Sequence, residues 1–168
     1  IMDGGFVLGP ALAALTGAFL LQIAVNLAND YFDGIKGVDT ENRLGPIRVT
    51  QSGLISPATV RNAMIWTLLA ALIVGFMLMI RGGWPVVGIG IAATVSTLAY
   101  SGGPFPLASN GLGDLFVFIF FGPVAVCGTY YVQTLKWNTA ILWNSLPVGL
   151  LVTAILVVNN LRDIETDR

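Results

Sequence analysis

The chain has 168 residues, of which 55% are hydrophobic and only 10% are charged, and its formal net charge is −1. Its mean hydropathy is +0.81, which indicates a membrane protein rather than a soluble domain. The net charge excludes a basic surface for nucleic acid. With no histidine and one cysteine, Cys127, the chain lacks the usual general base, a disulfide framework and a cysteine-based metal site.

Five apolar stretches are long enough to cross the hydrocarbon core of a bilayer, which takes roughly 20 helical residues. They cover residues 6–29, 62–80, 84–100, 114–133 and 140–159. Strands of a membrane β-barrel would be about half as long and would alternate in polarity, which these stretches do not. The sequence therefore predicts an all-α, multi-span transmembrane helical bundle that forms one domain over residues 1–168.

The basic residues predict how the bundle is oriented. If the five spans alternate in direction, one side of the bilayer receives Lys36, Arg43, Arg48, Arg61, Arg162 and Arg168. The other side receives only Arg81 and Lys136. The positive-inside rule makes the first side cytoplasmic. Every acid except Asp3 falls on that same side, although the rule does not require it, so we expect the chemistry at the cytoplasmic face.

A polar stripe follows the C-terminal half of the first span. It consists of Gln22, Asn26, Asn29 and Asp33. Their spacings of four, three and four residues place them on one face of a helix. Polar side chains at membrane depth are costly and usually face the bundle interior or a wet cavity. We expect the same here, although such amides can also serve only to hold helices together.

The last span ends in a similar pattern, with Asn159, Asp163 and Asp167 at i, i+4 and i+8. One such motif alone is usually only a solvated helix end, so the hypothesis depends on the pair. Carboxylates one turn apart suit Mg²⁺, which prefers oxygen ligands together with substrate phosphates. Two facing clusters could hold two ions around one diphosphate. The remaining phosphate oxygens would then be bound by the nearby bases, Lys36, Arg43, Arg48 and Arg162.

These motifs resemble those of the UbiA-type superfamily of intramembrane aromatic prenyltransferases. The first motif is Asn29-Asp30-Tyr31-Phe32-Asp33 followed by Asp39, and the second extends from Asp163 to Asp167. The six-residue step to Asp39, with "GPIRVTQSGLIS" at 45–56 and "GLGDLFVFIFFGPVAVCGTYYVQT" at 111–134, is similar to the branch that acts on 1,4-dihydroxy-2-naphthoate. Members have about nine spans, so the resemblance implies a fragment, incomplete at both ends.

The resemblance also implies roles for individual residues. A polyprenyl diphosphate would bind through Mg²⁺, with its tail in an apolar cavity among the helices. The metal ligands or their close neighbours would be Asn29, Asp33, Asp163 and Asp167, supported by Asp30 and Asp39. The implied substrate-binding residues are Lys36, Arg43 and Arg48, with Asn159 and Arg162 beside the second motif. Tyr100 and Asp114 flank the "SGGPFPLASNGLG" loop, which would help to place the aromatic acceptor.

The implied reaction transfers the polyprenyl group to dihydroxynaphthoate with loss of carbon dioxide, giving a demethylmenaquinol-type product at the inner (plasma) membrane. Three alternatives stay open. The acceptor can be another molecule, such as 4-hydroxybenzoate, homogentisate, haem or chlorophyllide. The chain can be an inactive truncated product. It can also be a transporter, but polar residues would then continue across the bilayer, whereas here they are confined to the cytoplasmic helix ends.

Overall fold

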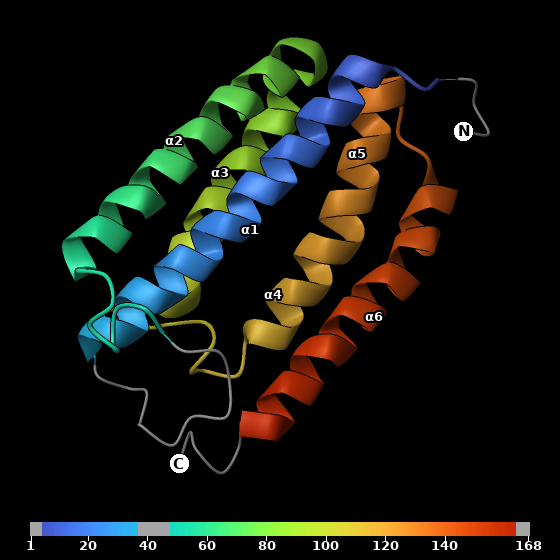
Figure 1. Ribbon diagram of the computed structural model, residues 1–168. Helices are drawn as coiled ribbons and strands as arrows, with labels where there is room; N and C mark the ends of the chain where they lie inside the picture. Colours follow the sequence, from blue (N-terminus) through green and yellow to red (C-terminus); the bar gives the residue numbers. More distant parts are fainter. Residues whose placement is uncertain (1–4, 37–47, 164–168) are drawn as a thin grey trace.

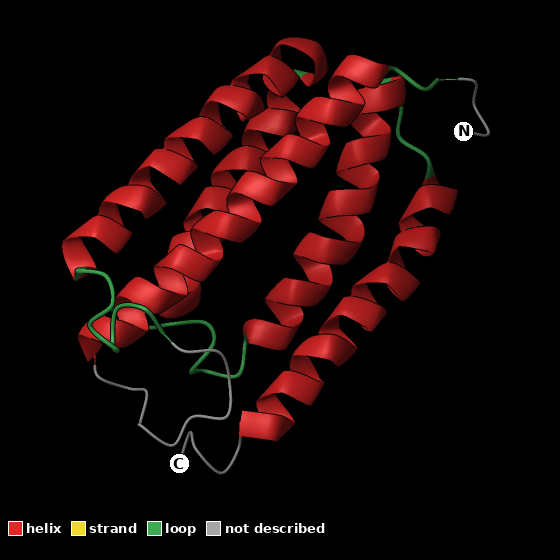
Figure 2. Ribbon diagram, in the orientation of Figure 1, coloured by secondary structure: helices red, strands yellow, loops and turns green. Residues whose placement is uncertain are grey.

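The computed structural model describes residues 5–36 and 48–163, and it contains no strand within them. Residues 1–4, 37–47 and 164–168, and the side chain of Asp163, lie outside the described residues. The elements are α1 (Leu8–Lys36), α2 (Pro57–Gly82), α3 (Trp84–Ser101), α4 (Gly113–Ile119), the π-helical turn η1 (Phe120–Val124), α5 (Ala125–Thr134) and α6 (Thr139–Asp163). Figures 1 and 2 show them as one helical bundle.

Five helical segments are long and apolar enough to cross a membrane, and they match the five predicted spans. Four are α1, α2, α3 and α6, and the fifth is the segment Gly113–Thr134, in which α4, η1 and α5 follow without a break. The prediction of an all-α, multi-span bundle is thus confirmed for the described residues.

Successive spans run in opposite directions, so the described loops gather at the two ends of the bundle (Figures 1 and 2). We call one of these ends the polar end. There α1, α3 and α6 finish, α2 and α4 begin, and the segments 48–56 and 102–112 connect them. The described bases at this end are Lys36, Arg48, Arg61 and Arg162, whereas Arg81 and Lys136 lie at the opposite end. The predicted division of basic residues therefore holds for the residues described.

Helices α1 and α2 pack closely because small side chains face the partner. Ala24 and Ala28 are fully buried, and they form a core cluster with Met64 and Leu68 of α2. Alanines in such positions let two helix backbones approach each other. The polar stripe of α1 does not face α2. Its residues Gln22 and Asn26 each lie two positions from Ala24, and a step of two residues turns a helix by about 200°.

Only the C-terminal half of that stripe is partly buried within this chain. Asn29 and Asp33 are partly buried, but Gln22 and Asn26 are exposed. The sequence periodicity correctly placed all four side chains on one face. It could not show that this face turns away from α2.

Helix α6 crosses the α4–η1 segment at two glycines. A Cβ atom added to Gly122 would lie 2.9 Å from the Cα of Gly149, and one added to Gly149 would lie 2.8 Å from the carbonyl oxygen of Phe118. The turn η1 contains Pro123, which has no N–H to donate to a regular helix and is accommodated by such a local irregularity. The glycine contact sets how close α6, whose last residue begins the second motif, comes to α4.

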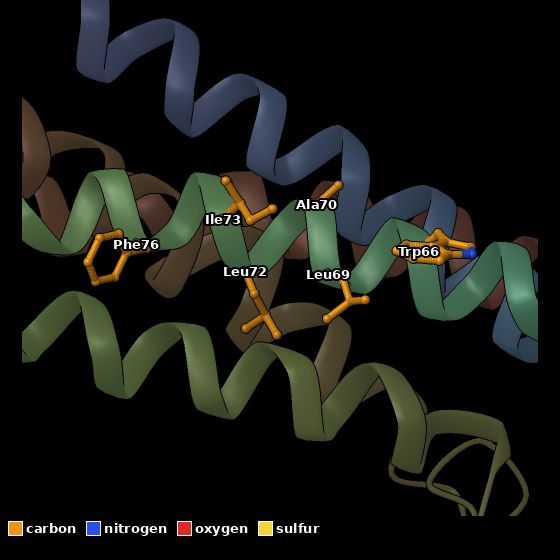
Figure 3. Close-up of a pocket in the computed structure, with 6 residues that line it drawn as sticks. All are labelled: Trp66, Leu69, Ala70, Leu72, Ile73 and Phe76. Carbon is orange, nitrogen blue, oxygen red and sulfur yellow. The ribbon is translucent and has the colours of Figure 1, made fainter.

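The outside of the bundle is apolar on every long helix. Phe19, Ile73 and Leu151, for example, are 62%, 67% and 68% exposed. Soluble proteins rarely show so continuous an apolar surface, whereas lipid tails cover it without cost. A shallow groove in this surface is lined by Trp66, Leu69, Ala70, Leu72, Ile73 and Phe76. Figure 3 shows these side chains along α2, with Leu69 and Leu72 pointing towards α3.

Candidate active site at the polar end of the bundle

The C-terminal turns of α1 carry the first aspartate motif, and the end of α3 binds them. The hydroxyl of Ser101 donates to Oδ1 of Asn29 at 2.7 Å, and the ammonium of Lys36 donates to the carbonyl oxygen of Ser101 at 2.7 Å. Ser101 is only 5% exposed. The Lys36 bond satisfies a carbonyl that the end of α3 leaves without a helical partner. An ammonium has three donors, so the bond is compatible with the expected contact to a phosphate.

The segment 48–56 brings a predicted diphosphate ligand to a predicted metal ligand. A guanidinium nitrogen of Arg48 lies 3.0 Å from Oδ2 of Asp33, and the two side chains are 20% and 24% exposed. Such a partly exposed ion pair contributes little to stability. It does hold the guanidinium of Arg48 next to the carboxylate of Asp33.

Asp30 differs from Asp33 in its environment. It is buried, and its Oδ1 accepts a hydrogen bond from the backbone N–H of Thr50 at 3.3 Å. The carboxylate is therefore turned towards the segment 48–56.

The loop 102–112 folds back onto the end of α3. The N–H groups of Leu107 and Ala108 donate to the carbonyl oxygens of Ala99 and Tyr100, both at 3.0 Å. A Cβ atom added to Gly113 would lie 3.2 Å from the hydroxyl oxygen of Tyr100, so the start of α4 touches the phenol.

Tyr100 lies between the first motif and α4. The carboxylates of Asp114 and Asp33 are both near enough to act on the phenol electrostatically. The structure thus brings together the two residues expected to flank the acceptor, Tyr100 and Asp114, and the first aspartate motif.

The second motif begins at the same end of the bundle. Asn159 and Arg162 are exposed in the last turns of α6, and Asp163 is the final residue of that helix. Figure 1 shows that α6 and α1 both finish at the polar end. The predicted residues that lie outside the described residues are Asp39, Arg43, Asp167 and the side chain of Asp163.

The donors at this end fit a hard cation. Asn29 and Asp33 present an amide and a carboxylate oxygen one helical turn apart, and Mg²⁺ binds such oxygens in preference to nitrogen or sulfur. Within residues 5–36 and 48–162, no group of three acidic, histidine or cysteine side chains could hold an ion by itself. Magnesium usually binds through one or two carboxylates and completes its shell with substrate phosphates and water. The residues present therefore fit an ion that a diphosphate shares.

Ser101 and Thr50 were not among the residues predicted from the sequence for this site. Both stand in sequence segments that the family resemblance singled out, Ser101 as the first residue of "SGGPFPLASNGLG" and Thr50 within "GPIRVTQSGLIS". Their partners are on α1, 72 residues away for Ser101 and 20 for Thr50. Nothing in the sequence specified which loop residue would reach which helix residue.

Comparison with known proteins identifies the family. The model of the UbiA prenyltransferase family matches residues 2–168. A 1,4-dihydroxy-2-naphthoate octaprenyltransferase of Mycobacterium tuberculosis is 41% identical over 157 residues, which are 94% of this chain and 53% of that protein. The protein of the same name from Escherichia coli is 39% identical over 164 residues, again 94% of this chain and 53% of the relative.

A third relative acts on a related acceptor by its name. It is a 2-carboxy-1,4-naphthoquinone phytyltransferase of Synechocystis, 29% identical over 91% of this chain and 49% of that protein. The chain thus spans about half the length of the curated relatives it matches. No solved structure matches it significantly. Because the family model covers nearly every residue, and both aspartate motifs stand within it, the chain belongs to the UbiA prenyltransferase family.

Proposed function

We propose that this chain forms the diphosphate-binding part of a Mg²⁺-dependent enzyme that transfers a polyprenyl group from its diphosphate to 1,4-dihydroxy-2-naphthoate. The observation that supports this best is the arrangement of Asn29, Asp33 and Arg48 at one helix end, with the Asp33–Arg48 contact at 3.0 Å. Cations and oxygen donors side by side are what a metal-bound diphosphate requires. The names of relatives, which give dihydroxynaphthoate or a carboxynaphthoquinone as the acceptor, support the choice of acceptor.

In this proposal both aspartate motifs contribute ligands to the same metal site. The ligands are Asn29, Asp33, Asp163 and Asp167, with Asp39 beside them. Bound Mg²⁺ would supply positive charge that stabilises the diphosphate as a leaving group. The described motif supports this role, since Ser101 orients the amide of Asn29.

The basic residues bind the phosphate oxygens directly. Arg48 is held beside Asp33, and Lys36 lies one turn further along α1, while Arg43 and Arg162 complete the set. When the bond between the allylic carbon and the diphosphate oxygen breaks, its electron pair stays on that oxygen. Charge-assisted hydrogen bonds from these residues strengthen as this negative charge develops.

The acceptor would bind beside the 102–112 loop, where Tyr100 and Asp114 lie. Its ring already has a nucleophilic carbon, so the chain needs no serine or histidine nucleophile. The ring attacks the allylic carbon to form a new carbon–carbon bond. The carboxylate on the attacked carbon then leaves as carbon dioxide, and its bonding electrons return to the ring. The apolar helices around the polar end keep water away from the allylic cation.

The same proposal places the site at the cytoplasmic face of the inner (plasma) membrane. The chain is a multi-pass membrane protein with five helices capable of crossing a bilayer. More of the described bases lie at the polar end than at the opposite end. Those at the polar end are Lys36, Arg48, Arg61 and Arg162, and those at the opposite end are Arg81 and Lys136. Such an excess marks the cytoplasmic side.

The test is the mass of the product formed in membranes that contain the complete reading frame. The membranes receive a polyprenyl diphosphate with dihydroxynaphthoate or hydroxybenzoate, with and without Mg²⁺. We expect a prenylated naphthoquinol only with Mg²⁺, and its loss in Asp163→Asn. The matched control is Asp3→Asn, the one acid that the sequence places at the opposite end.

Two other outcomes would contradict the proposal. A prenylated product formed with hydroxybenzoate but not with dihydroxynaphthoate would show that the proposed acceptor is wrong and that the proposed prenyl transfer is right. No prenylated product with any acceptor, despite correct insertion in the membrane, would refute the enzyme and favour the transporter.

A further inference from the structure

We propose that Asp30 and Thr50 are positioning residues that seat the turn 48–56 on α1 and thereby hold Arg48 at the diphosphate. The inference rests on the proposed function, because that function makes Arg48 a diphosphate ligand. It assigns Asp30 a role other than the metal support that the family resemblance implies. Four features of the structure carry it: a buried carboxylate, a glycine contact, a hydrogen-bonded turn and an unpaired hydroxyl.

The carboxylate of Asp30 binds the backbone of the turn. Asp30 is 7% exposed, and its Oδ1 accepts from the N–H of Thr50 at 3.3 Å. Asp33, one helical turn on, is 24% exposed. A buried carboxylate is unfavourable unless hydrogen bonds replace its water, and a backbone N–H is a donor that no side-chain substitution at position 50 except proline removes. Asp30 thus holds the turn through its main chain.

The contact between Thr50 and Gly34 fixes the turn from a second side. A Cβ atom added to Gly34 would lie 2.7 Å from Cγ2 of Thr50 and 2.9 Å from its Cβ. The methyl group of the threonine therefore lies directly over the glycine, one helical turn beyond Asp30. Only a residue without a side chain at position 34 lets the turn come this close.

The turn itself is tied together by backbone bonds. The N–H of Ser52 donates to the carbonyl of Arg48 at 3.0 Å, that of Gly53 to Thr50 at 3.3 Å, and that of Ile55 to Val49 at 3.1 Å. Arg48 and Thr50 therefore belong to one hydrogen-bonded unit. A shift of Thr50 away from α1 would carry Arg48 away from Asp33.

The hydroxyl of Thr50 takes no part in these contacts with α1. Its Oγ1 is buried and has no hydrogen-bond partner among the residues that the structure describes. A buried hydroxyl without a partner lowers stability, and its replacement by an apolar group of the same shape does not. Thr50 therefore binds α1 through its methyl group and its backbone N–H.

Reciprocal substitutions in the complete reading frame separate these parts. Asp30→Asn keeps an acceptor oxygen, whereas Asp30→Ala removes it. Thr50→Val keeps the methyl group and the N–H, whereas Thr50→Ser loses the methyl group that covers Gly34. For each variant, KM for the polyprenyl diphosphate and kcat are measured at saturating acceptor and Mg²⁺.

We expect Asp30→Ala to lower kcat/KM by roughly tenfold and to repeat the KM-against-kcat pattern of Arg48→Ala. Asp30→Asn should recover most of that loss. Thr50→Val should stay within about twofold of the unmodified enzyme, and Thr50→Ser should fall below it. Gly34→Ala should be as harmful as Asp30→Ala. The control is Gly9→Ala on the same helix, where an added Cβ atom meets nothing within 4 Å.

A double-mutant cycle then tests whether Asp30 acts through Arg48. If it does, Asp30→Ala combined with Arg48→Ala should be little worse than Arg48→Ala alone, since coupled residues are not additive. Additive losses, together with an Asp30→Asn variant as poor as Asp30→Ala, would overturn the inference and make Asp30 a metal ligand. A large loss in Thr50→Val would overturn it too, by showing that the hydroxyl binds a ligand.

Amide hydrogen exchange tests the hydrogen bond between the Thr50 N–H and Asp30 independently of enzyme activity. The Thr50 N–H should exchange slowly in the unmodified protein and in Asp30→Asn, and fast in Asp30→Ala. Fast exchange in the unmodified protein would refute the proposed attachment of the turn 48–56 to α1. A protected amide in a protein that prenylates no acceptor would refute the proposed function instead, so the two failures can be distinguished.

Discussion

Replacing Gly122 by alanine places a methyl group between the turn η1 and α6. The added Cβ atom would lie 2.9 Å from the Cα of Gly149, 3.0 Å from the carbonyl oxygen of Ser145 and 3.1 Å from the Gly149 nitrogen. All three are backbone atoms, which cannot rotate away as a side chain can. Carbon atoms pack at about 3.5–4.0 Å, so α6 has to move outwards by roughly 0.6–1 Å.

This movement has a cost in stability and a larger one in activity. Overpacking a helix contact costs about 1–3 kcal/mol, and the better helix propensity of alanine returns about 0.5–1 kcal/mol. A net loss of about 1–2 kcal/mol lowers Tm by several degrees, at roughly 2–4 °C per kcal/mol. Because α6 carries Asn159 and leads into the second motif, a shift of about 1 Å can also reduce kcat/KM by on the order of 100-fold.

The assay is thermal unfolding of the complete protein in detergent, followed by turnover of the same samples. The control is Gly88→Ala in α3, an exposed helical position where an added Cβ atom meets nothing within 4 Å. It should leave Tm unchanged or raise it slightly. If Gly122→Ala and Gly88→Ala have equal Tm and equal activity, the glycine contact does not set the position of α6.

Two further substitutions separate the ends of the bundle. Ser101→Ala removes the donor to Asn29 and should lower kcat/KM roughly tenfold, a loss of about 1–1.5 kcal/mol, with little change in Tm; activity within twofold would contradict the role of this bond. Arg81 donates to the carbonyls of Val132 and Gln133 at 2.6 and 3.0 Å and so caps α5. Arg81→Leu should lower stability by about 1–2 kcal/mol without raising KM for the diphosphate, and a raised KM would refute the separation.

The spans could be predicted from the sequence because hydropathy reports directly on length in a bilayer. All five proved to be helices. Their limits were less certain, and the largest difference is in α1. Its apolar run was predicted to end at residue 29, although the spacing of the polar stripe placed Asp33 on the same helix, and the helix continues to Lys36. Hydropathy detects the end of an apolar run, whereas a helix continues through polar residues as long as its backbone bonds form. That extension places Asp33 and Lys36 on a rigid element.

The candidate site could be predicted only as far as residue chemistry and spacing reach. Asn29, Asp33 and Arg48 could be selected because two similar acidic helix ends with bases nearby occur in one chain, and because these motifs resemble those of a known family. Ser101 and Thr50 could not, because their roles come from tertiary contacts that bring α3 and the turn 48–56 against α1. No periodicity within one segment encodes the partner of another.

The polar stripe shows the same limit on a larger scale. Its spacing correctly placed Gln22 and Asn29 on one face of α1. The exposure of Gln22 could not be predicted, because it depends on where α2 packs. Ala24 and Ala28, which have no functional signature, decide this by forming the contact with Met64.

The measurement that tests the central claim most directly is the thermal stability of the purified complete protein with inorganic diphosphate, with and without Mg²⁺. A ligand that binds only the folded state raises Tm, by an amount that grows with the logarithm of its concentration relative to Kd. We predict a higher Tm only when both are present, and no such rise in Asp33→Asn. An equal rise with diphosphate alone, or a rise that survives Asp33→Asn, would contradict a magnesium–diphosphate site at the polar end of the bundle.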